Sequence, residues 1–234
     1  DWPDWMHPAA WDHEHNHLHH FNTGEPGDPD LVERNARLLR RLPLPGLLKG
    51  LLVVVLMATW KLLYYAPSTY WAWRRKVARR AGPVDEETPA PRLSADDDCL
   101  VFPGERLLLP LSRRALGFWW RSPLPYFAWR FGLLPALFLP LGTTAWAAVL
   151  VNSLLAEVLG NLHTFAIIVP NHAGDDVHRY DDHFTDRDDF VLRQVLGSVN
   201  YTGGSDGRDF LQGYLTFQIE HHVWPDLPML KYRQ

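Results

Sequence analysis

The chain has 234 residues, with 23 Lys and Arg against 27 Asp and Glu, so its formal net charge is −4. This balance argues against a nucleic-acid-binding protein driven by a basic surface, and a hydrophobic fraction of 47% excludes a disordered low-complexity chain. The single cysteine, Cys99, excludes an intrachain disulfide framework and any cluster of thiolate ligands. Because the first residue is Asp1 and not Met, we expect the sequence to be an internal piece of a longer protein.

The N-terminal region, residues 1–41, is polar and rich in histidine, with five histidines in the eight positions 13–20. On a helix, His15 and His19 share one face and His20 lies about 100° around the axis. His13, His17 and His20 also line a face, so spacing alone leaves open which of them bind. Neutral imidazole is the commonest metal ligand, so the region predicts a metal site. The acidic segment 25–30 after it contains Pro and Gly and predicts a loop.

An apolar run follows over residues 44–66 and is interrupted by Lys49 and Lys61. Its length is near the roughly 20 residues that a membrane span needs. Its lysines and aromatic residues also suit a helix lying in the membrane interface. Residues 81–115 are charged and Pro-rich, which predicts a polar connector.

The most apolar segment is 131–170, in which Glu157 and His163 are the only ionisable residues. A turn at Gly142 would make this segment a transmembrane hairpin. The aromatic residues just before it are typical of an interfacial belt (Trp119, Trp120, Tyr126 and Trp129). We expect Glu157 and His163 to face the interior of the helix bundle.

If the histidines before and after the hairpin serve one site, an even number of spans must separate them. The hairpin supplies two, which makes 44–66 an interfacial helix, and the basic residues on both of its flanks then lie on the cytoplasmic side. The predicted fold is an all-α integral membrane protein: a transmembrane helical hairpin, an interfacial helix and a cytoplasmic histidine-rich helical cap.

Residues 171–234 return to polar sequence and carry further histidines. His221 and His222 are adjacent and cannot share one helix face, so they suit two different metal ions. His172 directly follows the apolar span and is the better ligand candidate in its group, whose other polar members are Asn171, Asp175, Asp176 and His178.

These motifs resemble those of the integral-membrane fatty acid desaturases, whose signature is three histidine boxes. His15-x-x-x-His19-His20 is similar to the second box, and Gln218-x-x-His221-His222 is similar to the third box in its glutamine-headed variant. Asn171-His172 resembles the extra histidine that follows the last membrane helix of that family. The resemblance covers nearly the whole chain as a single domain. The first box has no counterpart here, and we expect it upstream of Asp1.

The resemblance implies a desaturase that uses two Fe ions and O2 to introduce a double bond into a fatty acyl chain. It implies six iron ligands: His15, His19, His20, His172, His221 and His222. Gln218, Asn171, His178, Asp175, Asp176 and Glu220 would coordinate metal or orient the ligands. It further implies a separate electron donor, cytochrome b5 or ferredoxin, and a bacterial inner membrane or an endoplasmic reticulum as the location.

Two other functions remain open at this point. A membrane di-iron hydroxylase of a lipid, an alkane or a carotenoid would share the histidine boxes and differ in its product. A non-catalytic membrane metal-binding protein would hold zinc or copper in variable amounts.

Overall fold

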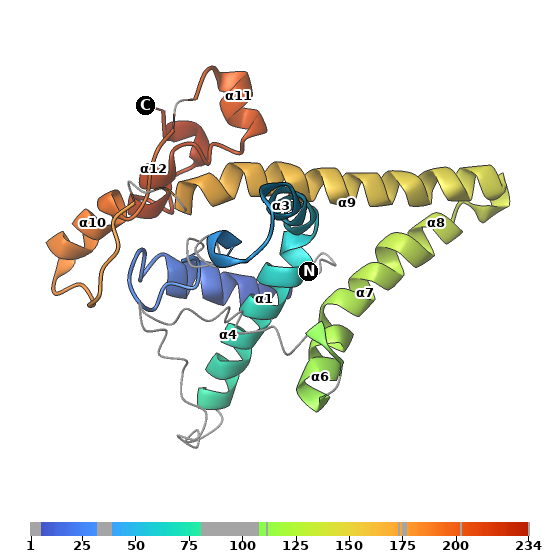
Figure 1. The fold of residues 1–234 in the computed structure, drawn as a ribbon, viewed down its shortest axis with the longest axis horizontal. Coiled ribbons are helices and arrows are strands. Elements are labelled where there is room, and N and C mark those ends of the chain that lie inside the picture. Colours follow the sequence, from blue (N-terminus) through green and yellow to red (C-terminus); the bar gives the residue numbers. More distant parts are fainter. Residues whose placement is uncertain are drawn as a thin grey trace. The chain divides into compact units, whose positions relative to one another are not determined.

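The computed structural model describes residues 6–31, 39–80, 108–110, 112–172, 174, 177–201 and 203–233, and all regular structure in these ranges is helical (Figure 1). In chain order the elements are α1 (Pro8–Asp12), η1 (His13–His19), α3 (Gly46–Trp60), η2 (Lys61–Tyr65), α4 (Ala66–Arg80), α6 (Arg113–Arg121), α7 (Pro123–Phe127), η3 (Ala128–Leu133), α8 (Leu134–Ala136), η4 (Leu139–Leu141), α9 (Thr143–His172), α10 (Arg187–Leu196), α11 (Asp206–Leu211), α12 (Gln218–Val223) and η5 (Met229–Lys231). Asp175 and Asp176, two of the predicted site residues, lie outside the described residues.

The chain divides into two compact units. The first unit comprises Asp1–Glu14, Leu44–Pro89 and Val101–His163, and the second comprises His15–Pro43, Ala90–Leu100 and Thr164–Gln234. The long helix α9 belongs to both, because the division falls after His163.

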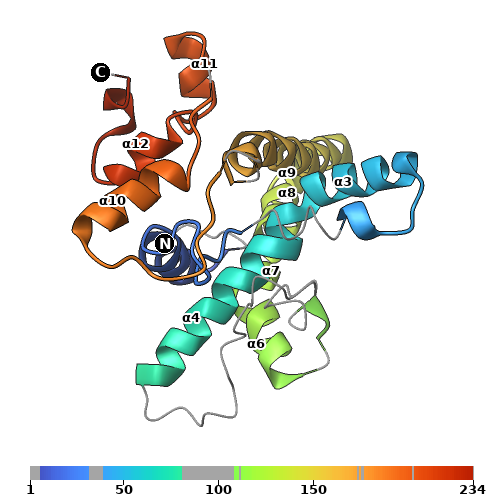
Figure 2. The same ribbon diagram turned by 60° about the vertical axis from the view of Figure 1, so that its left-hand side comes forward.

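The first unit has a small aromatic core in which α1 packs on α4 (Figure 2). Ala66, Tyr70 and Phe118 are buried together, and the Tyr70 and Phe118 rings pack edge to face 5.4 Å apart. The His7 ring stacks on Trp73 with 4.5 Å between ring centroids. Burial of large aromatic rings such as Tyr70 and Phe118 stabilises this part of the unit.

Three helical segments are long and apolar enough to cross a membrane: Gly46–Arg74, Arg113–Leu141 and Thr143–His172. Large apolar side chains on them are exposed, as at Leu47 (76%) and Leu141 (75%). Apolar side chains that point away from the protein are the pattern of a surface that contacts lipid. The structure thus confirms the predicted all-α architecture with membrane-spanning helices.

The turn of the hairpin is at Gly142, as the sequence predicts. Gly142 has a φ of +104°, a conformation that side chains with a Cβ rarely adopt. The first arm differs from the expectation, however, because it begins at Arg113 and not at residue 131. The predicted interfacial aromatic residues Trp119, Trp120, Tyr126 and Trp129 therefore lie within this arm. The reason is length: the segment from 131 to the turn is too short for the roughly 20 residues that a span requires.

The apolar run at 44–66 forms one continuous helical segment, Gly46–Arg74. Length and composition would let this segment cross the membrane, so its assignment to the interface remains a prediction.

Polar groups of the three candidate spans meet around Glu157. The Tyr126 hydroxyl donates to Glu157 Oε2 at 2.5 Å, and Asn161 Nδ2 lies 3.4 Å from Glu157 Oε1. Trp60 Nε1 donates to the Asn161 carbonyl at 3.1 Å. His163 is exposed, so the expectation that it faces the bundle interior is wrong. At about 100° per residue, six residues of helix carry His163 well away from the Glu157 side.

In the second unit, α10 and α12 lie side by side (Figures 1 and 2). The Asp186 carboxylate caps the start of α10 by accepting from the Asp189 N–H, and Asn200 Oδ1 accepts from the Ile219 N–H in the first turn of α12. These caps fix where both helices begin, and α12 carries Gln218, His221 and His222.

The last turn of α9, which carries Asn171 and His172, contains Pro170. Proline has no N–H to complete the helical hydrogen bonds, so this turn is weak by itself. Other parts of the second unit hold it: the Tyr201 hydroxyl donates to the Ile167 carbonyl at 3.0 Å, and Arg179 Nη2 donates to the His172 carbonyl at 2.8 Å.

Candidate metal centre

The N-terminal histidine cluster, which resembles the second box, folds as a wide helical turn, a π-helix over His13–His19. The His20 N–H donates to the His15 carbonyl at 3.1 Å, a bond between residues five apart. Single π-turns inside helices are frequent at functional sites. Because the turn is wider than an α-helix, the His15 ring meets His20 at 4.7 Å between centroids and also stacks on His19 at 5.6 Å.

One group of imidazoles consists of His15, His20 and His221, and we call it the open group. The Nε2 atom of His15 lies 3.3 Å from Nε2 of His20 and 3.4 Å from Nε2 of His221. His15 and His221 are half-buried, whereas His20 is buried. Three ring nitrogens thus converge on one point from two segments far apart in the sequence.

A second group consists of His19, His172 and His222, and we call it the buried group because all three side chains are buried. The ring centroid of His19 lies 4.9 Å from that of His172 and 4.8 Å from that of His222. All six histidines belong to the second unit. The structure therefore brings together each of the six predicted ligands, in two sets of three.

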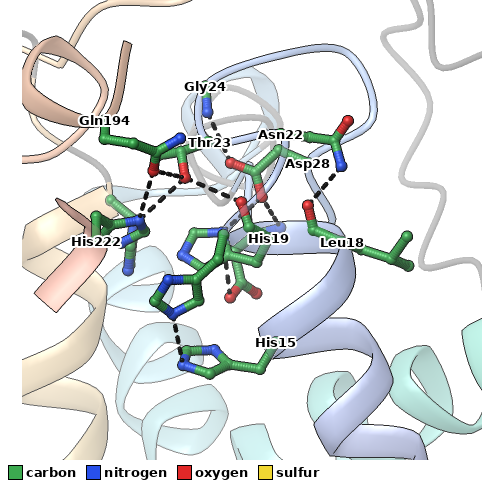
Figure 3. A network of polar contacts seen from close by, with 12 residues as sticks. His15, Leu18, His19, Asn22, Thr23, Gly24, Asp28, Gln194 and His222 are labelled. Carbon is green, nitrogen blue, oxygen red and sulfur yellow. Dashed lines mark hydrogen bonds and ion pairs between the residues drawn. The ribbon is translucent and has the colours of Figure 1, made fainter. Parts of the chain in front are cut away.

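The rings of the buried group are oriented by polar side chains (Figure 3). Asp28 Oδ1 lies 2.8 Å from His19 Nδ1, which leaves His19 Nε2 buried and without a hydrogen-bond partner among the residues that the structure describes. His222 Nδ1 lies 3.0 Å from the Thr23 hydroxyl and 3.2 Å from Gln194 Oε1. When Nδ1 carries the proton and donates it, the lone pair of Nε2 is free for a metal ion.

Burial keeps most of these imidazoles neutral. Desolvation, followed by the nearby His221 and His19 rings, lowers the pKa of His20 to about 3, and desolvation with His19 lowers the pKa of His221 to about 4. The pKa of His222 is also well below its ordinary value, mainly because of burial. Burial opposes protonation of His19 too, but the adjacent Asp28 carboxylate outweighs it and raises the pKa of His19. Neutral imidazoles are the form that binds metal.

Gln218 lies within the buried group. Its Nε2 atom is 2.9 Å from His222 Nε2 and 3.3 Å from His172 Nε2, and its Oε1 accepts from Asn171 Nδ2 at 3.2 Å. Asn171 is held in turn by its bond to the Leu215 carbonyl at 2.8 Å. The amide of Gln218 therefore presents its nitrogen, a donor, to the two rings.

The other predicted site residues lie elsewhere. His178 is exposed, belongs to neither group, and packs its ring on Tyr180 with centroids 4.6 Å apart. Glu220 accepts from Asn200 Nδ2 at 2.7 Å. His17 is exposed and also lies outside both groups.

Asp28, Thr23 and Gln194 orient the rings, and the sequence did not indicate them as site residues. Asp28 and Thr23 follow the first histidine cluster within nine residues, and a buried carboxylate near a histidine is the usual partner of a metal-bound ring. That signal was overlooked because the segment 25–30 has the composition of a solvent-exposed turn. Gln194 lies in an ordinary amphipathic helix, and nothing in its sequence context marks it.

A family model described as "Fatty acid desaturase" matches residues 1–234. The chain belongs to this family. Two curated relatives of the chain, from two strains of Mycobacterium tuberculosis, carry the name "NADPH-dependent stearoyl-CoA 9-desaturase". Each is 34% identical over 90 residues, which is 36% of this chain and 20% of the relative. The match thus spans about a fifth of the length of these relatives. No solved structure matches the chain at a significant level.

Proposed function

We propose that the protein is an O2-dependent desaturase that introduces a double bond into a fatty acyl chain, with two iron ions held by the open and the buried group. The observation that supports this most is the convergence of six imidazoles in two sets of three. Family membership and the name of the two curated relatives support the same activity.

The residues present fit iron. Imidazole is a ligand that suits iron, and the ring-nitrogen separations of 3.3 and 3.4 Å in the open group are close to those of ligands that share one metal at about 2.1 Å. His19 Nε2, a buried acceptor without a partner, is an atom that a metal ion would satisfy. Three imidazoles leave further positions on each ion for O2 or for other ligands.

A bound pair of irons would supply O2 activation and the removal of hydrogen from an unactivated methylene. The net reaction converts –CH2–CH2–, O2, two electrons and two protons into –CH=CH– and two molecules of water. The chain's own residues hold and orient the rings: Asp28 and Thr23 fix the tautomers of His19 and His222, and burial of the second group excludes water. The amide of Gln218 lies within hydrogen-bond reach of the His172 and His222 rings, so it would either orient these rings or bind the metal ion through its oxygen.

The convergence also bears on membrane topology. His19 precedes all three candidate spans and His222 follows them, so an even number of crossings must separate them. Two of the three segments then cross, and we propose the hairpin 113–172 as the crossing pair and the helix 46–74 as the interfacial one. Exposed basic residues such as Arg74, the last residue of that helix, support a cytoplasmic location for this side and its histidines.

The two electrons come from a separate protein, cytochrome b5 or ferredoxin, or from a further segment of the longer protein. The membrane is a bacterial inner membrane or an endoplasmic reticulum, and the acyl chain reaches the site from the bilayer.

Product analysis tests the proposal. The full-length protein is expressed in cells supplied with saturated fatty acids, and total fatty acids are analysed by gas chromatography and mass spectrometry. We expect a monounsaturated product and about two irons per purified chain. An alcohol in place of an alkene would show a hydroxylase, and zinc or copper in variable amounts without any oxidised product would show a metal-binding protein without this activity.

A further inference from the structure

The two histidine groups differ in the partners of their Nδ1 atoms. In the open group, His20 Nδ1 has no hydrogen-bond partner among the described residues, and His221 Nδ1 lies 3.4 Å from the neutral Tyr232 hydroxyl. In the buried group, His19 Nδ1 is paired with the carboxylate of Asp28 at 2.8 Å. His19 and Asp28 are 0% and 3% exposed, so this pair is shielded from solvent.

The carboxylate of Asp28 is held on more than one side. Its Oδ2 accepts from the Gly24 N–H at 2.9 Å, and its Oδ1 also accepts from the Asp30 N–H at 2.8 Å. Gly24 has a φ of +75°, and a Cβ there would come within 2.9 Å of the His178 carbonyl. The loop is thus built around a glycine that lets its backbone close on Asp28, and it fixes the carboxylate before any ligand is present.

The negative charge of Asp28 affects how the buried group binds a metal ion. A divalent cation among three buried, neutral imidazoles is costly unless an anion lies nearby. Asp28 supplies that anion one ring away, and a carboxylate that accepts the imidazole N–H raises the basicity of the ring and its affinity for metal. In the open group, the rings of His15 and His221 are half-buried, so solvent lowers part of the cost of placing a divalent cation there.

We infer that Asp28 is a positioning residue that makes the buried group the tighter of two unequal metal positions. The inference rests on the proposed function, since it assumes that both groups bind metal. It adds an order of binding: the position at His19, His172 and His222 fills first and empties last.

Stepwise metal binding tests the inference without reference to turnover. The full-length protein in detergent is stripped of metal and titrated with Co²⁺, whose visible absorption reports imidazole ligation. We expect two unequal steps in the wild type. Asp28→Asn should weaken the first step by about 10- to 100-fold and leave the second unchanged. The matched control is Asp181→Asn, which removes the same charge at an exposed position and should change neither step.

Two ligand variants assign the steps and keep the test decisive if Asp28→Asn fails to fold. His15→Ala should abolish the weaker step and keep the tighter one, whereas His222→Ala should abolish the tighter step. The reverse assignment, equal affinities in the wild type, or an unchanged first step in Asp28→Asn would overturn the inference and leave the two-metal site standing. A wild-type protein that binds no Co²⁺ at all would instead count against the proposed function.

Discussion

His15 and His20 place their Nε2 atoms 3.3 Å apart although five residues separate them along one helical segment. An α-helix would put residues five apart on different sides, about 140° from each other. The wide turn removes this offset and leaves His19 free to join the buried group. One short segment thereby serves both groups of rings.

Lengthening this turn should separate the two groups. Insertion of one alanine after His17 changes the spacing between His15 and His20 from five residues to six and rotates His15 by about 100° relative to the histidines that follow. We expect loss of the metal bound by the open group, measured as metal per chain, with the other metal retained. His17→Ala is the control, because it changes an exposed side chain in the same turn and keeps the spacing. Retention of both metals in the insertion variant would show that the spacing of this turn is not required.

Replacing a ring of either group should abolish turnover without loss of membrane insertion. His19→Ala and His221→Ala remove nitrogen ligands that lie outside the apolar segments, so the protein should still fractionate with membranes while alkene product becomes undetectable. His17→Ala should retain most of its activity, because His17 is exposed and lies in neither group. Equal losses at His17 and His19 would mean that the groups described here are not the ligand sets.

The Thr23 hydroxyl should matter more than the methyl group beside it. Its oxygen lies 2.8 Å from Gln194 Oε1, 2.9 Å from the His19 carbonyl and 3.0 Å from His222 Nδ1. Thr23→Val leaves these buried groups with one partner fewer, at a cost of about 1–3 kcal/mol in the free energy of unfolding. Thr23→Ser keeps the hydroxyl and should remain near the wild type. Thermal unfolding followed by circular dichroism checks both, and similar losses in the two variants would contradict the role of the hydroxyl.

Arg193 should be required for the loop that carries Asp28. The Glu25 carboxylate in that loop is buried and accepts from Arg193 Nη1 at 3.2 Å and from the Phe184 N–H at 3.0 Å. Arg193→Met leaves this carboxylate with only the Phe184 N–H and the His183 ring, 2.7 Å away, as partners, at a cost of about 1–3 kcal/mol in the free energy of unfolding. We expect a lower unfolding temperature and weaker metal binding. Arg187→Met, an exposed change in the same helix, is the control, and a comparable loss there would show that general charge and not this pair is responsible.

The hairpin could be predicted from the sequence because its signal is strong and local. The absence of Lys, Arg and Asp over residues 131–170 and the glycine at its turn are visible without a structure. The start of the first arm of the hairpin could not be predicted, because Arg121 and Arg130 interrupt the apolar pattern of residues 113–141.

The six candidate ligands were also visible, since histidines at box spacing are rare, and so was the division of His221 and His222 between two groups. The grouping of His15, His19 and His20 was not visible, because helical periodicity assumes 3.6 residues per turn and the segment His13–His19 is a wider π-helix. Asp28 and Gln194 reach the rings through tertiary contacts, which spacing along the chain does not encode.

The weak last turn of α9 affects the order in which the parts of the histidine site come together during synthesis. Pro170 deprives this turn of helical hydrogen bonds, and Asn171 is secured by the Leu215 carbonyl while Ile167 is secured by Tyr201. During synthesis His172 emerges from the ribosome well before either of these partners. The apolar helices can therefore form before the two histidine groups exist, and these groups come together only once the C-terminal segment has been made.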